Sequence, residues 1–193
     1  TEPDSIVSDG NQAFYRLASD WRFRKSLTLL IPPHQKIEEF LTRLRKDFLA
    51  QAKSNHAIPP KLKPLLEALA TQCFLNEYVY WQSDEEQQWV ESLIKKAKQS
   101  RAAFSEYLPI IGSYTPIHNI TTQEEINKYP INSDESKAFI DTQYNEVKIE
   151  KSIKARLNSS DDITDKISRA VQQMYEENPY PQYKHADLSL IHI

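Results

Sequence analysis

The 193-residue sequence predicts an all-α protein, built as an irregular multi-helix domain of about seven to nine helices. Apolar residues recur at steps of three and four along several segments, which is the spacing of one helix face. The chain holds only two glycines, Gly10 and Gly112, but eleven prolines. This balance fits helices that are joined by proline-containing and polar turns. Helix-capping pairs also stand directly in front of apolar periodic segments.

The composition excludes several classes of partner and compartment. Lysine and arginine total 24 against 27 acidic residues, and a net charge of −3 argues against a nucleic-acid partner. No apolar run approaches the roughly 20 residues of a membrane span, and the first residues are too polar for a signal peptide. A single cysteine leaves no internal disulfide and fits a reducing environment. We therefore expect a cytoplasmic protein without membrane or nucleic-acid partners.

The sequence also lacks the patterns that mark common catalytic and cofactor sites. Two distant glycines cannot form the glycine-rich turn that lets a backbone approach a nucleotide phosphate. The five histidines are scattered, and none has the spacing of a metal-ligand pair. We therefore expect no catalytic residue, no metal and no bound cofactor in this chain.

The chain divides into four regions. Residues 1–12 are polar and are expected to form a loose or disordered N-terminal arm. Residues 13–160 carry the helical domain, and residues 161–183 hold an amphipathic helix and a proline-rich segment. Residues 184–193 form a short tail.

The N-terminal part of the domain is expected to hold three helices. A short helical pattern begins at Phe14, and a second helix spans Trp21–Ile31 and is ended by Pro32. The third, Gln35–Ala52, is the most regular and has one apolar face. Its charged residues are expected on solvated faces, with a phosphate contact as the less favoured alternative: Arg43, Arg45, Lys46 and Asp47.

The segment Lys61–Gln82 is the most apolar of the chain, with apolar residues on more than one helix face. It predicts a central, largely buried helix. Asn76 and Glu77 interrupt the apolar pattern, and a buried carboxylate needs a partner or takes a raised pKa. Glu77 could therefore be a functional acid or base. We favour a structural role, in which its carboxylate pairs with an arginine or lysine or caps the end of a neighbouring helix. Cys73 is interpreted as a small buried hydrophobe rather than a nucleophile.

Further helices are expected towards the C-terminus. One spans Phe104–Ile111 and ends by Gly112, and a longer polar helix spans Ser133–Glu150. Two more begin at capping boxes, in which Ser or Thr is followed three residues later by Glu: Ser83 with Glu86, and Thr122 with Glu125.

The segment Asp162–Tyr183 predicts a helix that leads into a stiff, aromatic stretch. Asp162 can cap the helix start, and Pro179 prevents the helix from continuing. We refer to Glu176–Pro181 as the strap. The apolar stripe of the helix comprises Ile163, Ile167, Ala170, Val171, Met174 and Tyr175.

Two stretches carry more than periodicity: ATQCFLNEYVY at residues 70–80 and ISRAVQQMYEENPYP at residues 167–181. Together they resemble the helical region ahead of the catalytic domain in a family of bacterial class I S-adenosylmethionine-dependent methyltransferases. Members of that family often carry tetratricopeptide repeats further upstream. The resemblance runs from about Trp21 to Tyr183, and the second stretch is its more specific part.

The resemblance implies a parent methyltransferase whose S-adenosylmethionine is held in a C-terminal catalytic domain. This sequence contains neither the glycine-rich loop of such a domain nor tetratricopeptide repeats. We therefore expect a non-catalytic accessory domain, truncated before the catalytic domain, that recruits a protein substrate or positions the missing domain. The main alternative is a free-standing helical protein-interaction module, and a complete enzyme is the weakest reading. Both the accessory domain and the free-standing module are compatible with a homo-oligomer.

In that family the strap precedes an aromatic residue and then the catalytic domain. The resemblance thus implies that residues of the strap lie between domains or form a lid over the catalytic pocket. Asn178-Pro179-Tyr180 also resembles the Asn-Pro-Pro-Tyr motif of amino-group methyltransferases, so a catalytic role is one alternative, and a helix cap with an interdomain tyrosine is another. The candidates are Tyr175, Glu177, Asn178, Pro179, Tyr180 and Tyr183.

Overall fold

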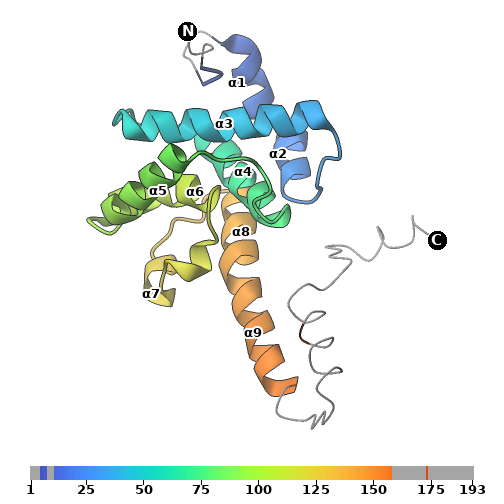
Figure 1. Ribbon diagram of the computed structural model, residues 1–193, viewed down its shortest axis with the longest axis vertical. Helices are drawn as coiled ribbons and strands as arrows, with labels where there is room; N and C mark the ends of the chain where they lie inside the picture. Colours follow the sequence, from blue (N-terminus) through green and yellow to red (C-terminus); the bar gives the residue numbers. More distant parts are fainter. Residues whose placement is uncertain (1–4, 8–10, 158–172, 174–193) are drawn as a thin grey trace, which may run out of the picture. The chain divides into compact units, whose positions relative to one another are not determined.

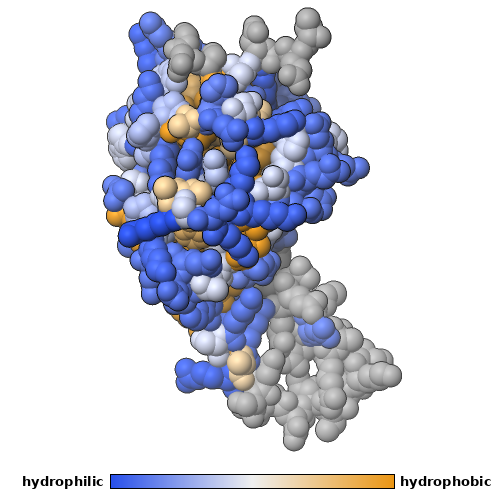
Figure 2. Space-filling view, turned by 90° about the vertical axis from the view of Figure 1, so that its left-hand side faces the viewer, coloured by the Kyte–Doolittle hydropathy of each residue, from blue (hydrophilic) through white to orange (hydrophobic). Residues whose placement is uncertain are grey.

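The computed structural model describes residues 5–7, 11–157 and 173, and every regular element among them is helical (Figure 1). The predicted all-α class is therefore confirmed for this part of the chain. The chain divides into two compact units, residues 1–148 and residues 149–193. The face in Figure 2 is largely hydrophilic with small hydrophobic patches, as expected when apolar helix faces pack inward.

The first unit begins with two short helices, α1 (Gln12–Ser19) and α2 (Trp21–Leu27). Asn11 and Asp20 cap them, because each side chain accepts hydrogen bonds from backbone N–H groups of the first turn. The prediction of a helix through Ile31 was too long. Helix α2 ends at Leu27, and its last carbonyls, of Lys25 and Ser26, accept from the N–H groups of Thr28 and Leu29 in a closing turn. Pro32 disfavours helical geometry at Ile31, so the helix does not resume before it.

Helix α3 (Gln35–Lys53) confirms the most regular predicted helix, and it packs against α4, α5 and α6 (Figure 1). It ends in a Schellman motif, in which Asn55 takes a left-handed φ of 56°. The N–H of Asn55 donates to the Ala52 carbonyl, and the N–H of His56 donates to the Gln51 carbonyl. The buried face of α3 holds Leu41, Leu44, Arg45, Phe48, Leu49 and Ala52.

Helix α4 (Lys63–Leu75) follows a 3-10 turn at Pro60–Leu62 and forms the centre of the core, packing against α2, α6 and α8. Residues 65–73 are all buried, which confirms a central buried helix. The predicted extension to Gln82 was wrong.

A second Schellman motif ends α4 at Leu75. Glu77 and Tyr78 have left-handed φ values of 57° and 58°, and the N–H of Tyr78 donates to the Cys73 carbonyl at 2.9 Å. Glycine is the usual residue at such a position, and its absence concealed the helix end from sequence reading.

Helices α5 (Asp84–Ala97) and α6 (Arg101–Gly112) pack against each other, and a short helix α7 (Gln123–Ile126) follows. Both predicted capping boxes are present at α5 and α7. Helix α8 (Asp134–Ile140), a π-helical turn at Asp141–Asn145 and α9 (Glu146–Leu157) form one continuous helical run, which extends beyond the predicted end at Glu150.

The π-helical turn places the side chain of Gln143 in the core, where it is fully buried. Its Nε2 donates to the carbonyls of Ala70 at 2.7 Å and Gly112 at 2.8 Å. Its Oε1 lies 3.3 Å from both the Ile117 N–H nitrogen and the Tyr78 hydroxyl. The side-chain amide of Gln143 thus joins α4, α6, the turn after α4 and the loop after α6. π-helical turns are rare and often occur where a helix must place one particular side chain.

Replacing Gly112 with alanine is expected to lower the free energy of unfolding by about 2 kcal/mol, because it overpacks a closed core site. A Cβ on Gly112 would lie 2.6 Å from Cε2 of the buried Phe139 ring. Urea denaturation followed by circular dichroism measures the change. An unchanged midpoint would show that the ring moves aside without cost.

Candidate functional site

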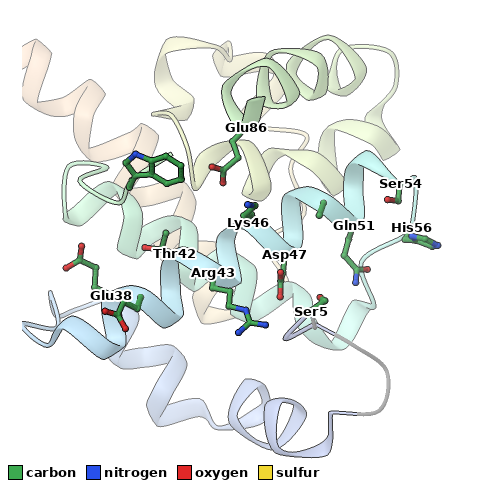
Figure 3. A pocket seen from close by; sticks show the side chains of 13 residues that line it. Ser5, Glu38, Thr42, Arg43, Lys46, Asp47, Gln51, Ser54, His56 and Glu86 are labelled. Atoms are coloured by element: carbon green, nitrogen blue, oxygen red, sulfur yellow. The ribbon is translucent and has the colours of Figure 1, made fainter. Parts of the chain in front are cut away.

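An open groove of about 820 Å³ runs along the solvent-facing side of α3 (Figure 3). The residues of α3 that line it recur in pairs every four positions, so they form one continuous helix face. The side chains of α3 that Figure 3 labels project from successive turns of the helix. The α3 residues that line the groove are Glu38, Glu39, Thr42, Arg43, Lys46, Asp47, Ala50 and Gln51.

Ser54 and His56, at and just after the carboxyl end of α3, also line the groove, and two other segments provide its remaining residues. Near the N-terminus, the N–H of Ile6 donates to the Asp47 carboxylate, and Gln51 Nε2 donates to the Val7 carbonyl at 2.8 Å. These bonds hold the segment that contributes Ser5. Trp81 and Glu86 come from the connection between α4 and α5 and from the first turn of α5.

The groove combines one exposed aromatic ring with charges of both signs. Trp81 is 71% exposed although it is a large apolar residue. The groove is lined by both carboxylates and cations: Glu38, Glu39, Arg43, Lys46, Asp47 and Glu86. Mixed charges around an aromatic side chain match the side chains of a protein better than a uniformly charged ligand.

Arg45 lies in the core beneath this groove and is fully buried, so its predicted place on a solvated face was wrong. Its Nη2 donates to the carbonyls of Trp81 at 2.8 Å and Tyr80 at 3.2 Å, and its Nη1 donates to the Ser113 carbonyl at 3.4 Å. Ser113 caps the carboxyl end of α6, where the helix dipole is negative. Dipoles of backbone carbonyls therefore stabilise the buried cation.

Aromatic rings and one carboxylate complete the surroundings of Arg45. The guanidinium lies 4.2 Å from the centroid of the Tyr114 ring, which is a cation–π distance. The Tyr114 hydroxyl donates to Glu86 Oε1 at 2.9 Å, while Glu86 Oε2 accepts from the Ser83 N–H at 2.8 Å. Burial raises the pKa of Tyr114 far above its usual value, so the phenol stays protonated and keeps donating. This network fixes the backbone of Trp81 and the side chain of Glu86.

A second buried polar cluster surrounds Glu67 on α4, and sequence reasoning missed it. Glu67 Oε1 accepts from the Tyr129 hydroxyl at 2.7 Å, and Oε2 lies 3.5 Å from the Ser133 hydroxyl. Burial raises the pKa of Glu67 to about 7, with a small upward contribution from Glu135, while Tyr129 and Lys63 act in the opposite direction. The only available signal was one carboxylate inside the apolar run Leu65–Ala70.

The two predicted buried polar candidates behave differently. Asn76 is buried at the C-cap of α4, and its amide lies beside Tyr80 without a well-formed hydrogen bond among the described residues. Glu77 is exposed, so its interpretation as a buried carboxylate was wrong. Glu77 lies in the turn after α4. The longer predicted helix would have buried this side chain in the core, but the helix ends at Leu75 and leaves it exposed.

Cys73 lies within the core, as predicted for a small hydrophobe. Burial raises the pKa of its thiol to about 12, although the nearby Arg45 cation lowers it in part. The thiol therefore stays protonated at neutral pH, which removes the thiolate that nucleophilic catalysis requires.

The strap and its neighbours, including Tyr175, Glu177, Asn178, Pro179, Tyr180 and Tyr183, lie outside the described residues. Within the described part of the chain, no group of three or more His, Cys, Asp or Glu side chains could hold a metal ion. No helix in that same part is long and apolar enough to cross a membrane.

Comparison of the chain with protein-family models, with curated proteins and with solved structures gives no match.

Proposed function

We propose that this chain is a non-catalytic helical domain that recruits a protein, and that this protein is the substrate of an S-adenosylmethionine-dependent methyltransferase to which the domain belongs. The observation that carries the recruiting role is the groove along α3 with the exposed ring of Trp81. The link to methyl transfer is supported by the resemblance of two sequence stretches alone.

Three properties of the groove favour a protein partner. A tryptophan is the residue most enriched among the energetic hot spots of protein interfaces. The groove volume of about 820 Å³ accommodates several side chains of a bound segment. Arg45 holds the carbonyls of Tyr80 and Trp81, so the backbone that carries the ring is ordered before binding, which reduces the entropy lost on association.

A free-standing protein-interaction module is the second candidate, and one observation favours it. In the first stretch that resembles methyltransferases, residues 70–80, polar side chains serve the packing of this fold. The Tyr78 hydroxyl lies 3.2 Å from the Gly112 carbonyl oxygen, and Gln72 faces the carbonyls of Leu27 and Leu30. The packing of this fold can therefore account for the residues at positions 70–80 without any link to methyl transfer.

Binding of peptides from a displayed random library tests the recruiting role. Replacing Trp81 with alanine is expected to raise the dissociation constants of the selected peptides by at least about tenfold, since truncating a hot-spot residue costs roughly 2 kcal/mol or more of binding free energy. Fluorescence anisotropy gives the dissociation constants. The matched control is Trp21→Ala, which removes a second tryptophan, 60% exposed, that does not line the groove. Equal effects of the two variants would refute the role of the groove.

Two further observations test the link to methyl transfer. Isothermal titration of S-adenosylmethionine into the chain should release no heat, whereas stoichiometric micromolar binding would overturn the non-catalytic assignment. The coding sequence downstream of the Ile193 codon separates the two candidates. A glycine-rich methyltransferase reading frame supports the accessory domain, and an immediate stop codon supports the free-standing module.

A further inference from the structure

Helix α9 presents an apolar stripe in the second unit. Ile149 and Ile153 are 58% and 47% exposed, and they lie one helical turn apart on the same face. Leu157 follows at the same spacing of four residues and is the last residue of the helix. Large aliphatic side chains at this spacing are typical of a helix face that packs against another helix.

The sequence beyond α9 contains a stripe of the same period. Ile163, Ile167 and Val171 follow one another at steps of four, inside the helix predicted after Asp162. Gln173, which lies off this stripe, is helical and exposed. The residues between the two stripes are polar, Asn158-Ser159-Ser160-Asp161-Asp162, and their number suits the short loop of an αα-hairpin.

We propose that the segment Ile163–Tyr175 docks antiparallel on the apolar stripe of α9 and closes an αα-hairpin with it. The two stripes then match position by position, because both repeat every four residues. The pairs of this register are Leu157 with Ile163, Ile153 with Ile167, and Ile149 with Val171.

The charges along the two segments agree with the antiparallel direction. The last turns of α9 carry Lys154 and Arg156, and Lys154 also pairs with Glu150 at 3.3 Å. The docking segment begins with Asp162 and Asp165. In an antiparallel hairpin these ends lie side by side, so basic residues meet acidic ones. Each end also carries the sign that its own helix dipole favours.

The tether favours this occupant over a second copy of the chain. Five residues between the stripes hold the docking segment at an effective concentration on the order of millimolar, far above that of a dilute second copy. The hairpin does not depend on the proposed function.

Disulfide trapping in the full chain tests the register. The pair Ile153→Cys with Ile167→Cys places two thiols face to face, whereas Ile153→Cys with Arg169→Cys puts the second thiol on the opposite helix face. The native Cys73 is buried and stays out of the reaction. We expect the first pair to form an intramolecular disulfide about tenfold faster than the second at any protein concentration, as read by non-reducing gel and peptide mass. Equal rates, or a covalent dimer as the main product, would overturn the proposal.

Hydrogen exchange of single variants covers the case in which cysteines weaken the hairpin. Ile153→Asn is expected to lower the protection of amides 163–175 by about tenfold, since it removes a buried aliphatic contact. Ala155→Asn introduces the same amide at an exposed position on the other side of α9 and should leave that protection unchanged. Absence of protection in the unsubstituted chain, or equal loss in both variants, would contradict docking on this stripe.

Discussion

Replacing Arg45 with alanine is expected to lower the free energy of unfolding by about 4 kcal/mol. The guanidinium is fully buried and satisfies the carbonyls of Tyr80, Trp81 and Ser113. Alanine leaves these oxygens buried without a donor and opens a cavity, and both effects destabilise the native state. Thermal unfolding followed at 222 nm should show a melting temperature about 10 °C lower.

The matched control is Arg43→Ala on the same helix, because Arg43 is exposed on the groove side. We expect this substitution to change the free energy of unfolding by less than about 0.5 kcal/mol. A third variant, Arg45→Lys, keeps the charge but has fewer donors, and it should fall between the other two. If Arg45→Ala is as stable as Arg43→Ala, the hydrogen bonds to the loop after α4 do not hold the fold together.

Replacing Glu67 with glutamine is expected to stabilise the protein at pH 8 by up to roughly 3 kcal/mol and to have little effect at pH 4. Burial raises the pKa of Glu67 from 4.5 to about 7 in the native state. Between these two values the native state retains a proton that the unfolded chain has released. Stability contributed by this group is therefore present below pH 4.5 and is lost as the pH rises to about 7.

Glutamine is neutral throughout this range, and its oxygen can still accept from the Tyr129 hydroxyl, so the variant should lack this loss. Lys63 on the same helix, and Glu135 with its partner Arg24, complete the charged surroundings of the carboxylate. Urea denaturation at half-unit steps from pH 4 to pH 8 measures the effect. Glu91→Gln, at an exposed position of α5, serves as the control. Parallel stability curves for wild type and Glu67→Gln would contradict a carboxyl group that titrates near neutrality.

Helical periodicity and local capping chemistry were readable in the sequence because both depend on residues a few positions apart. The capping boxes at Ser83 and Thr122 form as predicted, and α3 occupies the predicted range within one residue. The end of α4 was not readable. It depends on left-handed backbone conformations at Glu77 and Tyr78. Hydrogen bonds from the Tyr78 hydroxyl to the Gly112 carbonyl and to Gln143 Oε1 help to hold this turn, and both partners are distant in the sequence.

The candidate site was less predictable than the fold, since its parts come from distant segments. Trp81 belonged to the predicted buried helix, but the earlier end of α4 leaves it exposed on the groove. Arg45 belonged to the predicted solvated face, but the carbonyls of residues 80, 81 and 113 make a buried position favourable for its charge.

The sequence by itself determined the all-α class, the order of the helices and the capped starts of α5 and α7, because these follow from spacing and from chemistry within single turns. The tertiary structure alone decided which polar residues are buried. Arg45, Glu67 and Gln143 have no local pattern that distinguishes them from exposed residues of their type. Their burial is favourable only because hydrogen-bonding groups from other segments, tens of residues away in the chain, replace the water that each side chain loses.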